Sequence, residues 1–122
     1  MKTETEQWLK RASEDMGLAE AAWEREYYAA CVAHCQQAIE KVLKGSLVEA
    51  GIAFRKTHDL LELADNLHLE LDQDQRELLA RLTEEYKPSR YGDVYVEYPR
   101  EVAENYLVDT RKTYQWLLQL LK

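Results

Sequence analysis

The sequence YYAACVAHCQQAIEKVLKGSLVEAGIAFRKTHDLLELAD, residues 27–65, decides the fold that we expect for this chain of 122 residues. Apolar residues recur in its first half at spacings of three and four, which is typical of a helix with one buried face. Gly51 then marks a turn, because glycine adopts a left-handed backbone at little cost. Asp59 and Glu62 fit a capping box that begins the next helix. The stretch therefore predicts two helices, with the second folded back beside the first.

The rest of the chain supports an all-α fold. Its helical patterns predict five helices, at about residues 3–26, 27–50, 58–69, 72–86 and 99–122. Asp72 with Gln75 fits a second capping box, and Pro99 suits a helix start, where a missing N–H is harmless. The 4 Gly and 2 Pro of the chain are too few for the turns of a β-sandwich. We expect a single domain over residues 1–122, folded as a four- to five-helix, mostly up-and-down bundle.

Four residues of these helices carry expectations about packing. The stripe of the first helix places Asp15 on the outward face, and that of the last helix places Val102 and Val108 inward. Gly17 interrupts the first helix at a cost of about 1 kcal/mol relative to alanine. We therefore expect Gly17 to mark a close crossing between two helices.

Composition and charge exclude several classes of protein. The formal net charge of −7 argues against non-specific capture of nucleic acid. Positive charge is nevertheless concentrated in residues 41–58 and 86–100, where an anionic ligand would be met. The chain has no apolar run near the roughly 18 residues of a transmembrane helix, and its first residues lack a signal-peptide core. We therefore expect a cytoplasmic protein with no membrane association.

Cys31, His34 and Cys35 lie within one expected helical turn and raise the question of a metal site. A structural zinc site takes four ligands, usually from two elements, and the sequence offers no clear fourth. A di-iron bundle needs Glu-x-x-His on two helices, whereas the nearest match is a single Asp65-x-x-His68. The two cysteines also fall in the apolar stripe, at a spacing too wide for a disulfide. We expect no metal, no cofactor and two buried free thiols.

His34, Gln37, Glu40 and Lys41 are neighbours on one face of the second helix, because they are three and four residues apart. One interpretation is a solvated stripe that includes an ordinary Glu–Lys contact. The other is that this polar face lines a cleft against residues 87–99.

Residues 87–99, KPSRYGDVYVEYP, are the best candidate for chemistry in the chain. Arg90 is suited to holding a phosphate through two parallel hydrogen bonds. Tyrosines at positions 86, 91, 95 and 98 can stack on bases. The alternative is that the tyrosines cover the ends of the bundle, while Arg90 pairs with Asp93 or with a helix C-terminus.

Three segments of the sequence follow one another in an order that is typical of one protein family. They are HCQQAIEKVLKGSLVEAG from His34, KTHDL at residues 56–60, and YKPSRYGDVY from Tyr86. With them, nearly the whole chain resembles the HEPN family, small helical proteins of bacteria and archaea. The resemblance implies an all-α bundle, frequent homodimers and binding of nucleotide or RNA. It also implies a minimal nucleotidyltransferase, encoded next door, as the partner in what is often a toxin–antitoxin pair.

Many members of the family that the chain resembles are metal-independent ribonucleases. Their site is an arginine followed, after four to six residues, by a histidine, which relays a proton while the arginine stabilises phosphate charge. Arg90 fits the arginine position, but Tyr95 stands in the histidine position and no histidine follows His68. A tyrosine with an ordinary pKa near 10 is a poor base at neutral pH, which argues against this chemistry.

Three hypotheses follow. The first is a homodimeric module that binds nucleotide or RNA and regulates a nucleotidyltransferase, with phosphate-binding residues Arg90, Asp93, His34 and Lys41 and with Tyr95 nearby. The second is a ribonuclease toxin in which His34 or Tyr95 replaces the motif histidine. The third is a non-catalytic dimerisation scaffold whose partner performs the chemistry. The family association alone also suggests Tyr95 or Tyr98 as a hydroxyl that the nucleotidyltransferase modifies.

Overall fold

The computed structural model describes residues 1–86 and 97–121 of the chain. These residues form helices and no strands, so the expected all-α fold is confirmed. The helices are α1 (Thr3–Glu24), α2 (Tyr28–Ala50), α3 (Leu60–Asn66), α4 (Gln73–Glu85) and α5 (Arg100–Leu120). Within the described ranges, none of them is both long enough and apolar enough to span a membrane.

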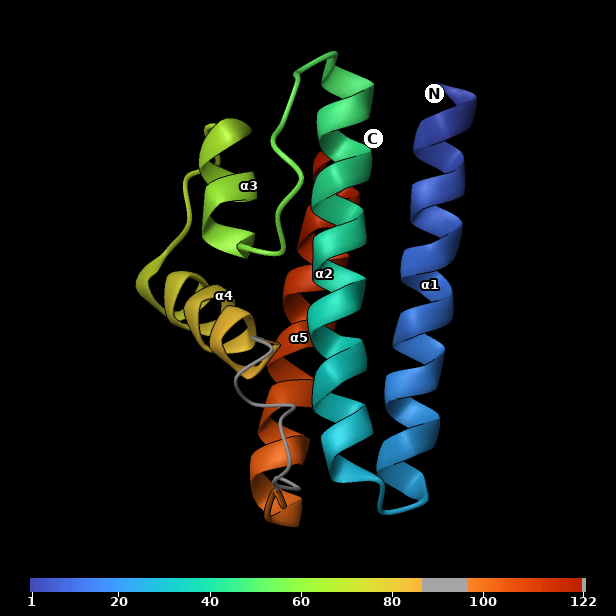
Figure 1. Cartoon of the computed structure of the whole chain (residues 1–122), viewed down its shortest axis with the longest axis vertical. Helices are drawn as coiled ribbons and strands as arrows, with labels where there is room; N and C mark the ends of the chain where they lie inside the picture. Colours follow the sequence, from blue (N-terminus) through green and yellow to red (C-terminus); the bar gives the residue numbers. More distant parts are fainter. Residues whose placement is uncertain (87–96, 122) are drawn as a thin grey trace.

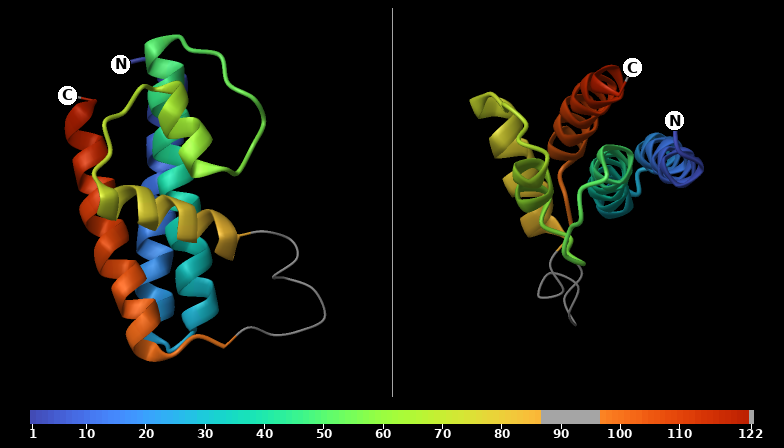
Figure 2. Two further views of the ribbon diagram at one scale, coloured as in Figure 1. Left: turned by 90° about the vertical axis from the view of Figure 1, so that its left-hand side faces the viewer. Right: turned by 90° about the horizontal axis from the view of Figure 1, so that it is seen from above.

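The three long helices stand side by side, and α2 contacts each of the other four helices. Helix α1 runs opposite to α2, whereas α5 runs in the same direction as α2 (Figure 1). Helices α3 and α4 lie on the side of the bundle away from α1, and α4 crosses α5 at a steep angle (Figure 2). Helices α1 and α2 therefore form an up-and-down pair, α5 runs parallel to α2, and α4 lies across the long helices.

The helix ends follow local signals. Helix α1 ends two residues earlier than expected, because Glu26 takes a left-handed backbone with φ 66° and turns the chain into α2. Gly51 ends α2 with φ 70°, as expected from its position. His68, at φ 56°, lies just beyond α3 and keeps that helix shorter than the sequence suggests.

The two expected capping boxes differ. Asp72 accepts a hydrogen bond from the Gln75 N–H, and the Gln75 side chain accepts one from the Asp72 N–H, so this box is complete. Asp59 caps α3 by accepting from the backbone of residues 61 and 62. Glu62, however, does not complete the box with Asp59, because its carboxylate accepts a hydrogen bond from Arg55 at 2.9 Å instead.

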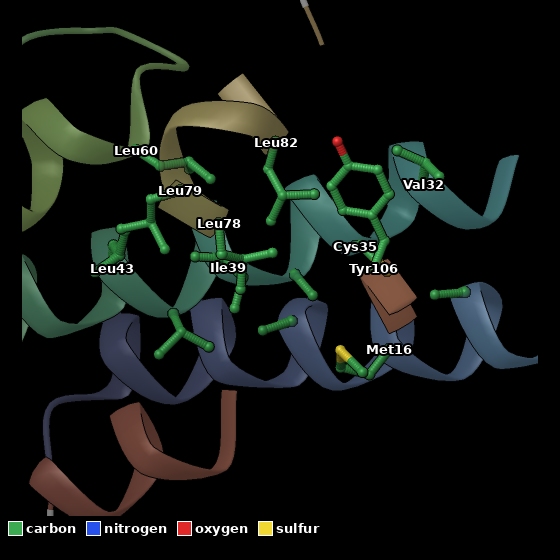
Figure 3. Close-up of a cluster of buried hydrophobic side chains, with 14 of the residues drawn as sticks. Met16, Val32, Cys35, Ile39, Leu43, Leu60, Leu78, Leu79, Leu82 and Tyr106 are labelled. Carbon is green, nitrogen blue, oxygen red and sulfur yellow. The ribbon is translucent and has the colours of Figure 1, made fainter. Parts of the chain in front are cut away.

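Side chains from α1, α2, α4 and α5 meet in one apolar core, seen for Met16, Ile39, Leu78 and Tyr106 in Figure 3. The largest fully buried apolar side chains are Ile39, Leu43, Leu47, Leu60, Leu63, Leu79, Leu82, Val32 and Val42. The thiols of Cys31 and Cys35 are buried in the same core and free, as expected. Helix α2, which supplies most of these side chains, is the centre of the fold.

Two expectations about packing are wrong. A Cβ on Gly17 would meet no atom within 4 Å, so this glycine marks no crossing. On α5 the buried face consists of Ala103, Tyr106, Leu107, Thr110, Thr113 and Leu117. Val102 and Val108 are about two-fifths exposed, at 39% and 37%. Small and hydroxyl-bearing residues take the inner positions of α5, so hydrophobicity alone selected part of the wrong stripe.

Candidate functional site

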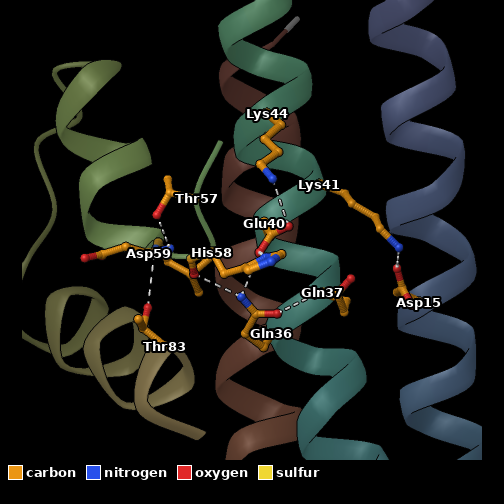
Figure 4. A network of polar contacts seen from close by, with 11 residues as sticks. Asp15, Gln36, Gln37, Glu40, Lys41, Lys44, Thr57, His58, Asp59 and Thr83 are labelled. Atoms are coloured by element: carbon orange, nitrogen blue, oxygen red, sulfur yellow. Dashed lines mark hydrogen bonds and ion pairs between the residues drawn. The ribbon is translucent and has the colours of Figure 1, made fainter. Parts of the chain in front are cut away.

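Two buried carboxylates, Asp15 of α1 and Glu40 of α2, organise the polar residues of the bundle (Figure 4). Each of them is bonded to one histidine and one lysine. A buried carboxylate is costly unless it is paired and hydrogen-bonded. One lysine for each carboxylate, together with the hydrogen bonds of the histidines, therefore accounts for the burial of both acids.

Asp15 faces α2 rather than solvent, so the expectation that it points outward is wrong. Its Oδ1 lies 2.8 Å from Nδ1 of His34, and its Oδ2 accepts a hydrogen bond from Nζ of Lys41. Both partners lie on α2 and are less than half exposed. The structure thus brings His34 and Lys41 together, on a carboxylate that the apolar pattern of α1 assigns to the surface.

Glu40 is the centre of the second cluster. Its Oε1 accepts a hydrogen bond from Gln36 at 3.0 Å and lies 2.7 Å from Nδ1 of His58. Its Oε2 accepts from Lys44 at 3.0 Å. Glu40 therefore pairs with Lys44, one turn further along α2, and Lys41 reaches across to α1. The polar face of α2 is accordingly not a solvated stripe.

The backbone around His58 is held from two sides (Figure 4). The His58 carbonyl accepts a hydrogen bond from Nε2 of Gln36 at 3.2 Å. The N–H of Asp59 donates to the hydroxyl of Thr57 at 3.1 Å, and the N–H of Leu60 donates to that of Thr83 at 3.1 Å. Hydrogen bonds from α2 and α4 therefore fix the end of the connector between α2 and α3, residues 51–59.

Tyr86, directly after α4, lies beside this cluster. Its ring packs edge-on against that of His58, with centroids 5.0 Å apart. Burial raises the pKa of the Tyr86 phenol above its usual value, and the negative charges of Glu40 and Asp15 raise it further. The phenol therefore keeps its proton at neutral pH and lies within the electrostatic reach of both buried carboxylates.

A pocket of about 400 Å³ opens next to His58 and Tyr86. It is lined by Arg55, Thr57, His58, Asp59, Leu61, Ala80, Thr83, Glu84 and Tyr86. Ligand pockets in proteins usually measure about 300–1,000 Å³, so this one has room for a small ligand. The sequence pattern KTHDL drew attention to residues 56–60, but nothing in it indicated that His58 would meet Glu40.

Several expected site residues fall outside the described ranges. Arg90, Asp93 and Tyr95 lie in residues 87–96, as does most of the segment expected to close over the polar face of α2. Tyr98, just after residues 87–96, donates a hydrogen bond from its hydroxyl to the carboxylate of Glu85. Among the described residues, no three histidine, cysteine or acidic side chains are grouped so that they could hold a metal ion.

Residues 5–120 of the chain match the HEPN domain. The chain belongs to the HEPN family. Its helical architecture agrees with two solved structures. One is ST0689, an archaeal HEPN homologue, with 30% identity and a TM-score of 0.81 over the whole of both chains. The other is TT1696 from Thermus thermophilus, with 25% identity and a TM-score of 0.82 over 97% of this chain and 98% of that one.

This HEPN protein is also similar in sequence to an archaeal protein. It is 28% identical to the candidate toxin MJ1304 of Methanocaldococcus jannaschii, over 94% of this chain and 86% of that protein. The similarity therefore covers both clusters of buried carboxylates and the pocket beside them.

Proposed function

We propose that this HEPN protein binds nucleotide or RNA and acts as the homodimeric partner of a minimal nucleotidyltransferase, in a toxin–antitoxin-like pair. The observation that carries the proposal is the pocket at His58 and Tyr86, which combines an aromatic wall with hydrogen-bonding side chains. Aromatic side chains stack on bases of any sequence. Similarity to a candidate toxin supports the toxin–antitoxin-like role.

In this proposal Arg90 binds the phosphate, and Asp93, His34 and Lys41 assist it. Arg90 follows Tyr86 by four residues in the sequence, and Tyr86 forms part of the pocket wall. An arginine holds a phosphate through two hydrogen bonds in a fixed geometry. The pairing of His34 and Lys41 with Asp15 leaves no uncompensated carboxylate at that place to repel an anion.

Titration with nucleotides and with short fluorescent RNA tests the binding. We expect Arg90→Ala to weaken affinity at least tenfold, because hydrogen bonds to charged groups contribute about 1.5–3 kcal/mol. Arg76→Ala is the matched control. Arg76 is an exposed arginine near the start of α4, and its contact with Asp65 is long, at 3.9 Å. Equal binding by wild type and Arg90→Ala would contradict the role of Arg90 in binding phosphate. If neither protein binds, the proposed binding of nucleotide or RNA is wrong.

Co-expression with a minimal nucleotidyltransferase tests the partnership. We expect the two proteins to purify together and the HEPN protein alone to sediment as a dimer. The mass of the co-expressed chain also reports whether Tyr95 or Tyr98 is modified. A monomer that never associates with the nucleotidyltransferase would contradict the proposal, and an unmodified mass would leave the two tyrosines without this role.

A further inference from the structure

Another pocket, of about 480 Å³, lies between α4 and α5, which cross at a steep angle (Figure 2). One wall is formed by side chains between residues 74 and 81 of α4, and the other by side chains between residues 109 and 116 of α5. Within each helix these side chains are three and four residues apart, so they lie on one face. The pocket shares no lining residue with the one beside His58.

We propose that the pocket between α4 and α5 binds a linear aliphatic polyamine, a flexible chain that carries an ammonium group at each end. The charged side chains of the lining are four carboxylates and two basic groups: Asp72, Asp74, Glu77 and Asp109, with Arg81 and Lys112. This excess of negative charge attracts a cation and repels a phosphate. The ligand class is therefore different from the one proposed for Arg90.

The carboxylates of both walls are available to a ligand. Asp74 and Asp109 are exposed, and neither makes a hydrogen bond or an ion pair within the described part of the chain. Glu77 accepts a hydrogen bond from Gln73 at 3.0 Å but has no cationic partner among the same residues. An acid in the first turn, such as Asp74, is ordinary because it complements the helix dipole. Glu77 lies beyond that turn and Asp109 lies inside α5, so the dipole does not account for them.

The two basic side chains of the lining do not neutralise these acids. Arg81 lies over the ring of Tyr106, with the guanidinium carbon 5.4 Å from the ring centroid, and an aromatic face attracts a cation in this position. Lys112 is exposed. Within the described ranges neither Arg81 nor Lys112 forms an ion pair. A cationic ligand therefore has no internal salt bridge to displace.

Thr113, on the α5 wall, is a buried hydroxyl without a partner. The residue is 5% exposed, and its hydroxyl makes no hydrogen bond to any residue that the structure describes. Buried polar groups normally have such a partner. Because Thr113 lines the pocket, the N–H of a bound ammonium can donate to its oxygen. This hydroxyl points to a ligand independently of the carboxylates.

The remaining surface of the pocket suits an aliphatic chain with separated charges. Leu78 and the partly buried Trp116 provide apolar surface for the methylene groups, and the indole can also attract an ammonium. Among the described residues, no three acidic, histidine or cysteine side chains are grouped so that they could hold one metal ion. The acids are thus spread over two walls. A polyamine reaches both walls, whereas the lysine side chain of a partner protein brings a single ammonium.

Titration of the ¹⁵N-labelled protein with spermidine, followed by NMR at low ionic strength, tests this inference. The indole N–H signal of Trp116, assigned with Trp116→Phe, reports on the pocket, whereas Trp8 and Trp23 lie outside its lining. We expect a saturable shift of the Trp116 signal and little change in the other two. The affinity should fall as salt is added, because exposed charges are screened.

Substitutions separate a built site from the general attraction of an acidic protein for cations. The double variant Asp74→Asn/Asp109→Asn should weaken spermidine binding by about tenfold, because it removes one charge from each wall. Glu101→Gln/Glu104→Gln is the matched control. It changes the net charge by the same amount at exposed positions of α5 outside the pocket, and it should bind as the wild type does. Thr113→Val keeps the shape of the side chain and should weaken binding by about fivefold.

Other probes distinguish the polyamine from other cations. Butylamine, which has a single ammonium group, and Mg²⁺ at the same ionic strength should each bind at least about tenfold more weakly than spermidine, because neither can engage both walls at once. Equal binding by either of them overturns the proposal, as does equal loss of affinity in the two double variants. A lysine-rich peptide that shifts the Trp116 signal where spermidine does not would identify a protein partner and overturn it too. The binding of nucleotide or RNA is measured separately with Arg90→Ala, so either proposal can fail without the other.

Discussion

A Cβ atom built on Gly45 of α2 would lie 3.0 Å from Cβ of Trp8 on α1. Real side chains rarely approach so closely, and a Cβ of tryptophan cannot swing aside because it is attached to the backbone. The same added atom would lie 3.6 Å from the backbone oxygen of Thr5. Helices α1 and α2 therefore approach each other closely at a position where the sequence offers no side chain.

The two helical glycines should respond oppositely to alanine. Gly17→Ala should stabilise the protein by up to about 1 kcal/mol, because the new methyl meets no atom and alanine is the better helix former. Gly45→Ala should destabilise it by about 1–3 kcal/mol, since α1 must move away from α2. Urea denaturation of both variants measures the difference. Similar changes of the same sign would mean that the helices are not in contact at Gly45.

The pairing of Asp15 with α2 should appear in the stability of the protein. Asp15→Ala leaves Lys41 and His34 without their buried partner, and removal of one member of a buried pair costs about 3–5 kcal/mol. We expect a loss near the lower end, because Lys41 and His34 retain some contact with water. Glu14→Ala, at the exposed neighbouring position, should change the free energy of unfolding by less than about 0.5 kcal/mol. Equal effects at the two sites would contradict the inward orientation of Asp15.

The capping box of α4 should contribute measurably to stability. Asp72→Ala removes the acceptor for the Gln75 N–H and should cost about 1 kcal/mol. Asp72→Asn keeps an acceptor at the same place and should be almost neutral. Thermal unfolding of the two variants, followed by circular dichroism, makes the comparison. A loss of similar size in both would point to the charge of Asp72 rather than to its hydrogen bond.

Glu49 should contribute to the dependence of stability on acid. A hydrogen bond from the backbone of Lys2, and then one from the Thr5 hydroxyl, hold the pKa of Glu49 below its ordinary value of 4.5. Its stabilising effect is therefore complete above pH 4.5 and is lost as the pH falls through the lower folded value. The stability difference between wild type and Glu49→Gln should shrink over that window. Denaturation curves from pH 7 to pH 3 test this, and a constant difference would be the contrary result.

The parts of the fold that the sequence predicts are those encoded by neighbouring residues. The left-handed turn at Gly51 and the capping box of Asp72 and Gln75 each depend on a few consecutive positions. The apolar period of α2 likewise extends over many turns, so its buried face emerges without ambiguity. Helix α5 shows the limit, because Ala103 and Thr110 are buried while Val108 is not.

The parts that could not be predicted depend on partners distant in the sequence. A carboxylate in an amphipathic pattern is assigned to the surface, yet Asp15 is buried by partners 19 and 26 residues away. Glu40 and His58 are 18 residues apart on different elements. Only the packing of the connector against α2 brings them together, so no local pattern could have indicated this contact.

The candidate site was therefore predicted in part. His34 and Lys41 were selected from their spacing, and the structure brings both onto Asp15. His58 was missed, although it is the histidine that lines the pocket. The roles of Arg90 and the rest of residues 87–96 remain predictions, because these residues lie outside the described ranges.

The two buried cysteines allow the opening of the native bundle to be followed by thiol labelling. The side chains of Cys31 and Cys35 are fully shielded, and the pKa of Cys35 is raised by its hydrogen bond with Cys31 and by burial. A thiol reagent can therefore react only after the surrounding helices separate. The rate of labelling then measures how often the bundle opens. Any ligand or partner that stabilises the closed bundle should lower the rate of labelling, and this test needs no substitution in the protein.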